Sequence, residues 1–455
     1  MGFVRSCDTA IVGAGASGSA ALLALAQNAG SFERVILFDS NRPGPGTAYR
    51  DEQADSLLMN GPARSMSIVA GDDGHLIRWL GGGSPDRLIS RKRYGSYLAQ
   101  TIQRALERRP AFAHNAAEII DVESIAEGYV LTDRAGIQYG ARNVILALGN
   151  HLPANAALPD SVRTHPAYHA DPWRLGSTQP LGAVAIVGTG LTAMDVATQF
   201  FERGFHAPIY MISRRGILPA VENPAVRGLP SVTLELDVRS PYQLLRSVRR
   251  SVLEHESQGG DWRSIVESVR ELAPQIWMGW PERERRRFIR HLQSQWVTHR
   301  YRVPPATHQT CRKLIENGQL KLVAGRVTGA RPIGANTLRM TITGRDSTMH
   351  IDAGAVVNAT GPNLDYETIA HPLVRNASSR GLIRADSLRL GLDVTSGLRC
   401  ISAAGTAAEG LFALGPPARG RFYESTAIPE IRAHAQIIAK TIRSQDSLVV
   451  LGAVS

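Results

Sequence analysis

Two stretches of the chain show the same order of hydrophobic and polar positions. Each has a short apolar run, a glycine-rich turn, a longer apolar run with many small residues, and another short apolar run. The runs are residues 9–12, 19–26 and 34–38 in the first stretch and 183–187, 191–203 and 208–212 in the second. Short buried runs that flank a helix-length run predict strand, helix and parallel strand. The pattern therefore predicts two α/β units.

The first glycine turn has the spacing of a dinucleotide-binding turn. Gly13 permits a sharp turn, Gly15 lets a pyrophosphate approach bare backbone, and Gly18 lets the helix lie close to the strand. Ser17, at the start of the helix, is included because a pyrophosphate sits on a helix N-terminus. Asp39 ends the next strand about 20 residues later, where an acid binds a ribose hydroxyl. An acid at that place favours a ribose without 2′-phosphate, so we expect FAD here. The alternative is a glycine turn in an ordinary α/β unit.

The second turn differs where a ribose would lie. Its first two glycines are present, and Ala193 replaces the third, which the looser form of the motif allows. Two arginines, and no acid, follow the next strand. Guanidinium groups match the charge and geometry of a phosphate, so we expect NADPH in preference to NADH. The alternative is that these arginines only solvate a loop. The expected contacts are Gly188, Gly190, Leu191, Thr192, Arg214 and Arg215.

The order of elements predicts a discontinuous first domain. Small-residue strand exits recur at 147–150 and 355–362, and a charged, helical stretch covers about 240–317. We expect an α/β fold with two Rossmann-like dinucleotide-binding domains, the NADP domain inserted into the FAD domain. The predicted boundaries are 1–175 for the first part of the FAD domain, 176–335 for the NADP domain with its helical insert, 336–445 for the return part, and 446–455 for a C-terminal tail.

Composition narrows the class of protein. The chain has 455 residues and a net charge of +11, carried mainly by arginine. Two phosphate-bearing cofactors need positive charge, and no nucleic-acid motif accompanies it, so no nucleic-acid partner is expected. No apolar run is long enough for a membrane span, and the first strand leaves no room for a signal peptide. Cys7, Cys311 and Cys400 are far apart, which excludes a redox pair and a zinc site and favours a reducing cytoplasm. The sequence is compatible with a homo-oligomer and does not decide the oligomeric state.

An arginine-rich segment lies inside the helical stretch. Phe288, Leu292 and Trp296 recur at four-residue spacing between residues 282 and 302, as on one face of a helix. The preferred interpretation is an amphipathic helix with a solvated basic side. The alternative is a cap that closes over substrate or over the NADP phosphate.

These motifs together resemble a bacterial FAD/NAD(P)-binding family of two-dinucleotide flavoproteins. The resemblance covers nearly the whole chain. The segments that carry it are residues 57–63, 171–173, 188–195, 213–219, 357–362, 414–416 and 424–431.

A wider resemblance is to the class B flavin monooxygenases, which also have FAD first, NADP second and an Ala-Thr-Gly turn, here ending at Gly361. The resemblance implies a flavin-side contact at Gly415, although Pro416 stands where many relatives have an acid. It also implies catalytic roles for three residues. His169 and Trp173 match half of the monooxygenase fingerprint, and Asn60 matches an asparagine beside the flavin. A turn with a buried tryptophan and a plain turn are the simpler interpretations.

The preferred function is an NADPH-dependent, FAD-containing monooxygenase that oxidises a small soft nucleophile with O₂ through a flavin C4a-hydroperoxide. Amine N-hydroxylation and S-oxidation are both compatible with the motifs. One alternative is an FAD oxidoreductase that passes electrons from NADPH to an organic acceptor without inserting oxygen. The other is a non-catalytic redox sensor that binds both cofactors. No metal is expected, because the histidines of the arginine-rich segment lack ligand spacing.

Overall fold

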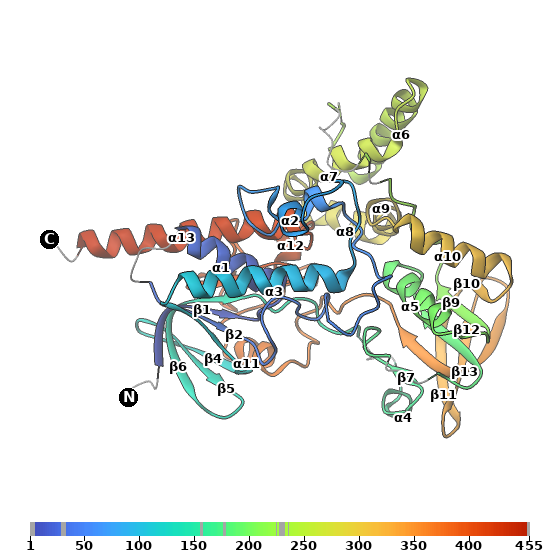
Figure 1. Ribbon diagram of the computed structural model, residues 1–455, viewed down its shortest axis with the longest axis horizontal. Coiled ribbons are helices and arrows are strands. Elements are labelled where there is room, and N and C mark those ends of the chain that lie inside the picture. Colours follow the sequence, from blue (N-terminus) through green and yellow to red (C-terminus); the bar gives the residue numbers. More distant parts are fainter. Residues whose placement is uncertain are drawn as a thin grey trace.

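The computed structural model describes residues 5–28, 33–154, 158–175, 179–223, 225–226, 233–234 and 236–452. The strands of these residues form two separate sheets, and each sheet contains one of the predicted α/β units. The sheets lie in two lobes, and a group of helices lies above them (Figure 1).

The first sheet is built around β1 (Arg5–Val12). This strand pairs in parallel with β2 (Val35–Phe38) and β6 (Gln138–Leu146). Beyond them lie β3 (Phe112–Asn115) and β15 (Ala407–Ala413), also parallel. Because the centre of the sheet is buried on both faces, β2 is apolar at every position instead of alternating. The remaining strands of this sheet are antiparallel: β4 (Ile119–Ile125), β5 (Gly128–Asp133) and β14 (Arg399–Ile401).

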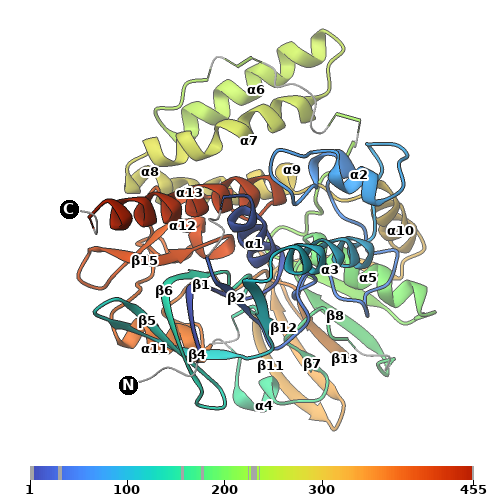
Figure 2. The ribbon, with the colours of Figure 1, turned by 60° about the vertical axis from the view of Figure 1, so that its left-hand side comes forward.

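Three helices cover one face of the first sheet (Figure 2). They are α1 (Ala16–Asn28), α3 (Arg91–Arg108) and α13 (Ile428–Gly452), and α1 contacts both of the others. The small residues of α1 allow this close packing, and Gly18, Ala20, Ala21 and Ala24 are all buried. The predicted tail from 446 thus continues as helix to Gly452.

The second sheet has the order β10-β9-β8-β13-β12-β11. Its parallel strands are β8 (Ala183–Val187), β9 (Ile209–Ser213), β10 (Leu320–Ala324) and β13 (Thr348–Asn358), with the two-residue β7 (Tyr168–His169) beside β13. An antiparallel hairpin of β11 (Arg326–Gly334) and β12 (Thr337–Thr343) extends the sheet from β13. The helix α5 (Leu191–Glu202) follows β8, and α10 (Pro305–Glu316) packs beside it.

The sheet order corrects one predicted boundary. We expected the chain to return to the first domain at residue 336, but β12 and β13 belong to the second sheet. The return comes after Asn358, where β13 ends. The apolar run 355–357 fits a central strand of either sheet, so the sequence pattern alone does not assign it.

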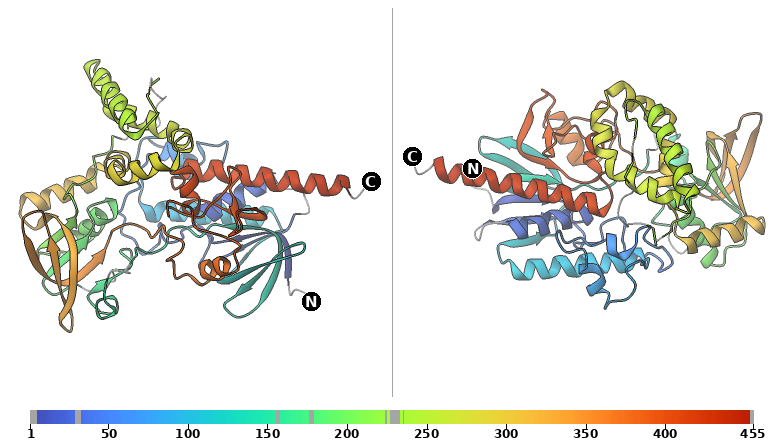
Figure 3. Two further views of the ribbon diagram at one scale, coloured as in Figure 1. Left: turned by 180° about the vertical axis from the view of Figure 1, so that it is seen from behind. Right: turned by 90° about the horizontal axis from the view of Figure 1, so that it is seen from above.

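The helical insert consists of α6 (Pro241–Ser257), α7 (Trp262–Gly279), α8 (Glu282–His291) and α9 (Gln293–Arg300), followed by α10. Seen from above, it lies over the junction of the two lobes (Figure 3). The shorter helices are α2 (His75–Trp79), α4 (Asp160–Arg163), α11 (Pro372–Ser379) and α12 (Arg419–Phe422). Within the described residues, no helix is both long and apolar enough to cross a membrane.

The arginine-rich segment is not one helix with a solvated basic side. The chain turns at Leu292, between α8 and α9, although the three apolar residues of the predicted face do share one core with Trp277 and Tyr423. Arg300 and Arg302 are fully buried. Both are paired with glutamates that lie far away in the sequence, which the local pattern does not reveal.

Candidate dinucleotide sites and their junction

The first glycine turn follows β1 directly. Gly13 has φ +98°, and a Cβ there would lie 2.4 Å from the carbonyl oxygen of Ala147, at the exit of β6. Its N–H donates to the oxygen of Phe38 at 2.8 Å, and the N–H of Ala147 donates to that of Val12 at 2.9 Å. A Cβ on Gly18 would lie 1.9 Å from the oxygen of Gly13. Both glycines are therefore required by close backbone approach.

The second turn repeats this construction on other strands. Gly188 has φ +132°, and a Cβ there would lie 2.3 Å from the oxygen of Ala359, at the exit of β13. Its N–H donates to the oxygen of Ile212 at 2.7 Å, and the N–H of Ala359 donates to that of Val187 at 2.9 Å. The third position holds Ala193, which is fully buried. The two predicted units thus share one backbone design.

Other segments cover the first turn. The N–H of Gly44 donates to the oxygen of Ala14 at 2.8 Å, and a Cβ on Gly15 would lie 3.5 Å from the Cα of Gly46. From the end of the chain, Gly415 (φ +80°) comes so close to Ser17 that its Cβ would lie 2.2 Å from the hydroxyl oxygen. The structure therefore brings Gly415 to the N-terminus of α1, and its predicted contact with the flavin stays a prediction.

Asp39 lies where the predicted ribose contact requires it, directly after β2. One carboxylate oxygen accepts the N–H of Ala14 at 2.8 Å, and the other accepts that of Asn41 at 2.9 Å. The Asn41 side-chain amide also donates to Oδ1 at 3.1 Å, whereas Oδ2 keeps a second lone pair that can accept a hydroxyl group. The hydrogen bond to Ala14 holds the acid against the turn.

The second turn is open by comparison. Gly190 is exposed, and a Cβ on it would meet open space. Gly190 is also the N-cap of α5 and offers no side chain to the first-turn N–H groups of Leu191 and Thr192. Such a helix end can hold a phosphate. Arg214 and Arg215 follow β9 and are both exposed.

Two residues outside the predicted cofactor contacts shape the second site. The hydroxyl of Thr189 donates to the oxygen of Ile217 at 2.7 Å and so ties the turn to the loop that carries the two arginines. The amide oxygen of Asn358 accepts the N–H and hydroxyl of Thr360 at 3.3 and 2.7 Å, and its nitrogen donates to the Tyr168 hydroxyl at 3.0 Å. These bonds set the Ala-Thr-Gly turn that leads to the exposed Gly361 (φ +98°). Thr189 stands inside the glycine motif, which is a signal that could have marked it.

Trp173 lies at the junction of the two lobes. The guanidinium of Arg91 lies over its ring, 4.9 Å from the ring centre. Arg91 begins α3 of the first lobe and pairs with Asp195 of α5 in the second lobe at 3.0 Å. Nearby, Asp171 pairs with Arg50 at 3.3 Å. The segment that was predicted as half of a catalytic fingerprint therefore also joins the two cofactor lobes.

His169 and Asn60 have different surroundings. His169 is half-buried in β7 beside Val357 of β13, and burial lowers its pKa, so its ring is neutral at pH 7. Asn60 is half-buried in the segment that runs beside residues 85–91, where Met59 donates its N–H to Ile89 at 2.8 Å and Leu57 accepts that of Arg91 at 2.8 Å. Arg91 thus connects the Asn60 segment with Trp173.

The first site fits a large polar cofactor. Gln53, in the loop that covers the first turn, is 6% exposed, and neither amide atom has a hydrogen-bond partner among the described residues. A buried amide without partners is costly unless a ligand supplies them. FAD has donors and acceptors along its length, so the donor set of this loop fits it.

The cysteines take no part in either site. Cys7, Cys311 and Cys400 are buried thiols in three different elements, β1, α10 and β14. Burial raises the pKa of Cys7 and of Cys311 to about 12, which keeps both protonated. In the part of the chain that is described, no group of three His, Cys, Asp or Glu residues could hold a metal.

The comparisons with known proteins agree with this geometry. The FAD-NAD(P)-binding family model matches residues 10–151, and the L-lysine 6-monooxygenase/L-ornithine 5-monooxygenase model matches residues 84–268. None of the curated proteins matches the sequence.

Solved structures with the same fold are similar over nearly the whole chain. The ornithine N-hydroxylase of Kutzneria sp. 744 is 14% identical with a TM-score of 0.68, covering 97% of this chain and 100% of its own. The cadaverine monooxygenase of Erwinia amylovora is 14% identical with a TM-score of 0.65 (96% and 94%). The L-lysine 6-monooxygenase of Pseudomonas syringae is 13% identical with a TM-score of 0.63 (96% and 99%). The predicted two-dinucleotide fold and the resemblance to flavin monooxygenases are confirmed.

Proposed function

We propose that this chain is an FAD-dependent monooxygenase that uses NADPH and O₂ to hydroxylate the nitrogen of an amine. The observation that carries the proposal is the pair of glycine turns of one construction, the first covered and the second open. A covered site suits a cofactor that stays bound, and an open site suits one that is exchanged in each turnover. The choice of an amine as the substrate rests on the match to the L-lysine 6-monooxygenase/L-ornithine 5-monooxygenase family model, which covers part of both lobes.

In this proposal the first turn holds the FAD pyrophosphate. Gly13, Gly15, Ser17 and Gly18 present backbone and the helix end, Asp39 accepts the ribose hydroxyls, and Gly415 closes the site from the other side. The second turn holds NADPH in the same way, with Arg214 and Arg215 on the 2′-phosphate. Bound FAD supplies the acceptor for the NADPH hydride and the activation of O₂.

Residues of this chain would position the substrate beside the flavin and keep water away from it. The Asn60 amide is a donor that can orient a group beside the flavin. His169 is neutral at working pH, because burial lowers its pKa, and so can accept a proton from the substrate nitrogen. Trp173, under Arg91, is a positioning residue that fixes how the two cofactor lobes meet. The helical insert lies over that junction and can exclude water from it.

The test is NADPH consumption in air by the FAD-loaded enzyme with a panel of primary amines and of thioethers. We expect one amine class to yield hydroxylamine in step with NADPH, and NADH to support much slower turnover. NADPH consumption that yields only hydrogen peroxide with every amine and thioether contradicts the proposal. So does rapid anaerobic turnover with a quinone in the absence of any oxygenated product. Negligible NADPH oxidation would contradict enzymatic function itself and favour a sensor.

A further inference from the structure

A group of arginines lies where the helical insert meets the end of the chain. Arg285 belongs to α8 and Arg300 to α9, whereas Arg419 and Arg421 belong to α12, which directly follows the flavin-side Gly415 segment. We call these four residues the arginine seam. Two of them take part in one continuous stack with aromatic rings, and the other two lie close to its ends.

The stack fixes the positions of Arg285 and Arg419. The Arg285 guanidinium lies 5.5 Å from the centre of the Trp277 ring, and the Trp277 and Tyr423 rings lie 4.7 Å apart. The stack continues with the Arg419 guanidinium, which lies 5.2 Å from the centre of the Tyr423 ring. Cation–π contacts orient a guanidinium without neutralising its charge. The neighbouring charge of Arg421 adds to the burial that lowers the pKa of Arg285.

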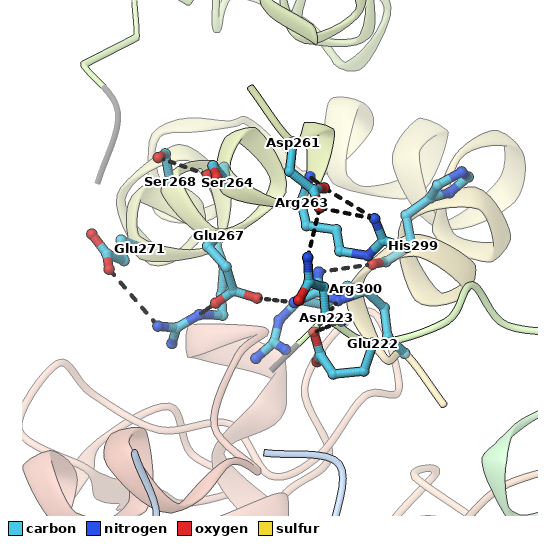
Figure 4. A network of polar contacts seen from close by, with 12 residues as sticks. Glu222, Asn223, Asp261, Arg263, Ser264, Glu267, Ser268, Glu271, His299 and Arg300 are labelled. Atoms are coloured by element: carbon cyan, nitrogen blue, oxygen red, sulfur yellow. Dashed lines mark hydrogen bonds and ion pairs between the residues drawn. The ribbon is translucent and has the colours of Figure 1, made fainter. Parts of the chain in front are cut away.

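Arg300 has only part of its hydrogen bonds satisfied. It is fully buried, and its Nη2 lies 3.3 Å from an oxygen of Glu424. The same glutamate already accepts the indole N–H of Trp296 at 3.0 Å and the Tyr301 hydroxyl at 3.5 Å. Nε and Nη1 of Arg300 have no hydrogen-bond partner within the described chain. Figure 4 shows Arg300 close to Glu222 and Glu267, between the insert and the C-terminal segment.

The neighbouring Arg302 shows what complete pairing looks like. It is also fully buried, but its Nε donates to Glu222 at 3.0 Å and its Nη2 to Glu267 at 2.5 Å. In the seam, Arg300 pairs with Glu424, and the negative charges of Glu267 and Glu430 also lie near it. Glu424 is shared among three donors. The carboxylate of Asp386, behind α12, is occupied by the N–H groups of Leu388 and Leu390 at 2.8 and 2.6 Å.

Arg285 donates to the oxygens of Trp280 and Met278 at 2.9 and 3.1 Å, but the seam still holds guanidinium N–H groups that no described acceptor satisfies. Nε of Arg419 and Nε of Arg421 are also buried without a partner among the described residues. Buried guanidinium donors without acceptors are costly, and an anion that enters between them recovers that cost. Guanidinium forks match phosphate and carboxylate oxygens in geometry.

We infer that the arginine seam binds the anionic end of the substrate, and that this end carries at least two negative charges, as in a phosphate monoester or a pair of carboxylates. The seam starts beside the flavin-side segment, so a substrate held there extends its amine toward the first cofactor site. The substrate class rests on the proposed function, whereas anion binding does not. A diamine, such as the cadaverine named for the Erwinia relative, is the opposite kind of ligand.

The direct test uses inorganic phosphate and the FAD-loaded enzyme, with binding measured by calorimetry and by the rise in Tm. Arg419→Gln and Arg421→Gln should each weaken phosphate binding about tenfold or more, since each removes a charged hydrogen bond. Arg300→Gln should do the same where it folds. The matched control is Arg290→Gln, an exposed arginine of α8, which should bind phosphate as the wild type does.

Two results overturn the inference. One is phosphate affinity that is equal in the wild type, Arg419→Gln and Arg421→Gln. The other is loss of FAD from these two variants, which would mean that the arginines serve the cofactor. Saturating FAD is therefore present throughout, and flavin content is measured for every variant.

A second experiment tests the class of substrate. Amines of equal length that end in a phosphate, one carboxylate or a second amine are compared by kcat/KM. We expect the phosphate-ended amine to be preferred and Arg419→Gln to raise its KM at least tenfold with little change for the diamine. Preference for the diamine in the wild type contradicts the substrate assignment. If no amine is hydroxylated but phosphate binding still depends on the seam, the proposed function fails while the anion site stands.

Discussion

The two dinucleotide units use the same backbone and differ in what lies over it. In each, the first glycine donates to the end of the neighbouring strand and meets the carbonyl of an alanine at a strand exit. Over the first turn lie Gly44, Gly46 and Gly415, whereas Gly190 of the second turn is exposed. The glycine motif thus sets the backbone of each turn, and we expect the surrounding loops to determine whether a bound dinucleotide stays.

The largest effect is expected from Gly13→Ala, because the added methyl would lie 2.4 Å from the oxygen of Ala147 at a φ of +98°. A contact this close between buried backbone segments has no low-cost relief, so we expect loss of FAD and poor folding. Flavin content and Tm measure it. Gly136→Ala is the control, with a φ of +82° but open space around it, and should cost only about 1–2 kcal/mol. An FAD-loaded, stable Gly13→Ala enzyme would contradict the backbone argument.

Gly188→Ala should separate the two units. Its methyl would lie 2.3 Å from the oxygen of Ala359, but the distortion falls on the open second turn. We expect FAD to remain bound and NADPH reduction of the flavin to be lost or slowed at least tenfold, measured anaerobically by stopped flow. Loss of FAD from this variant as readily as from Gly13→Ala would contradict the assignment of different cofactors to the two turns.

Removing the arginines of the second unit should change cofactor choice without changing the fold. Arg214→Gln and Arg215→Gln each delete a charged donor to the expected 2′-phosphate, worth about tenfold to a hundredfold in kcat/KM for NADPH. Turnover with NADH, which lacks that phosphate, should change little. Equal losses with both nucleotides would mean that these exposed side chains do not read the phosphate.

The last prediction concerns the ion pair that links the two lobes. Burial raises the pKa of Asp195 from 3.8 to about 6, and Arg91 opposes part of that rise. The folded protein therefore binds a proton that the unfolded chain has released, so this carboxyl's contribution to stability falls as pH rises from about 4 to about 6. The change is on the order of 2–3 kcal/mol.

The measurement is Tm against pH for the wild type and Asp195→Asn. We expect the variant to lose less stability than the wild type between these two pH values. The control is Asp352→Asn in the exposed pair with Arg339, which should leave the stability nearly unchanged because solvent screens exposed ion pairs. Parallel curves for the wild type and Asp195→Asn would show that this carboxyl does not titrate in that window.

The parts predicted from the sequence are those in which one short segment determines its own geometry. The two turns, the acid after β2 and the helix N-termini depend on residues within about 30 positions of one another, so spacing was sufficient. The return of the chain to the first sheet was predicted too early, because an apolar run does not show which sheet it joins. Gly415 reaches Ser17 from nearly the whole length of the chain away, and only the resemblance pointed to it.

The burial of Arg300 and Arg302 could not be read from the pattern. Both stand in a run of arginines whose other members are mostly exposed. What distinguishes them is contact with Glu222, Glu267 and Glu424, from a loop, α7 and the segment before α13. A charged residue in a local sequence pattern indicates a solvent-exposed face. Only the tertiary structure shows whether carboxylates from distant segments pair with it and allow its burial.

The most direct test of two dinucleotides in one chain is an anaerobic titration of the purified protein, followed by flavin absorbance. We expect about one FAD per chain, which NADPH reduces rapidly and NADH reduces far more slowly. A colourless protein that takes up no FAD on reconstitution, or a bound flavin that NADPH leaves oxidised, would contradict this expectation.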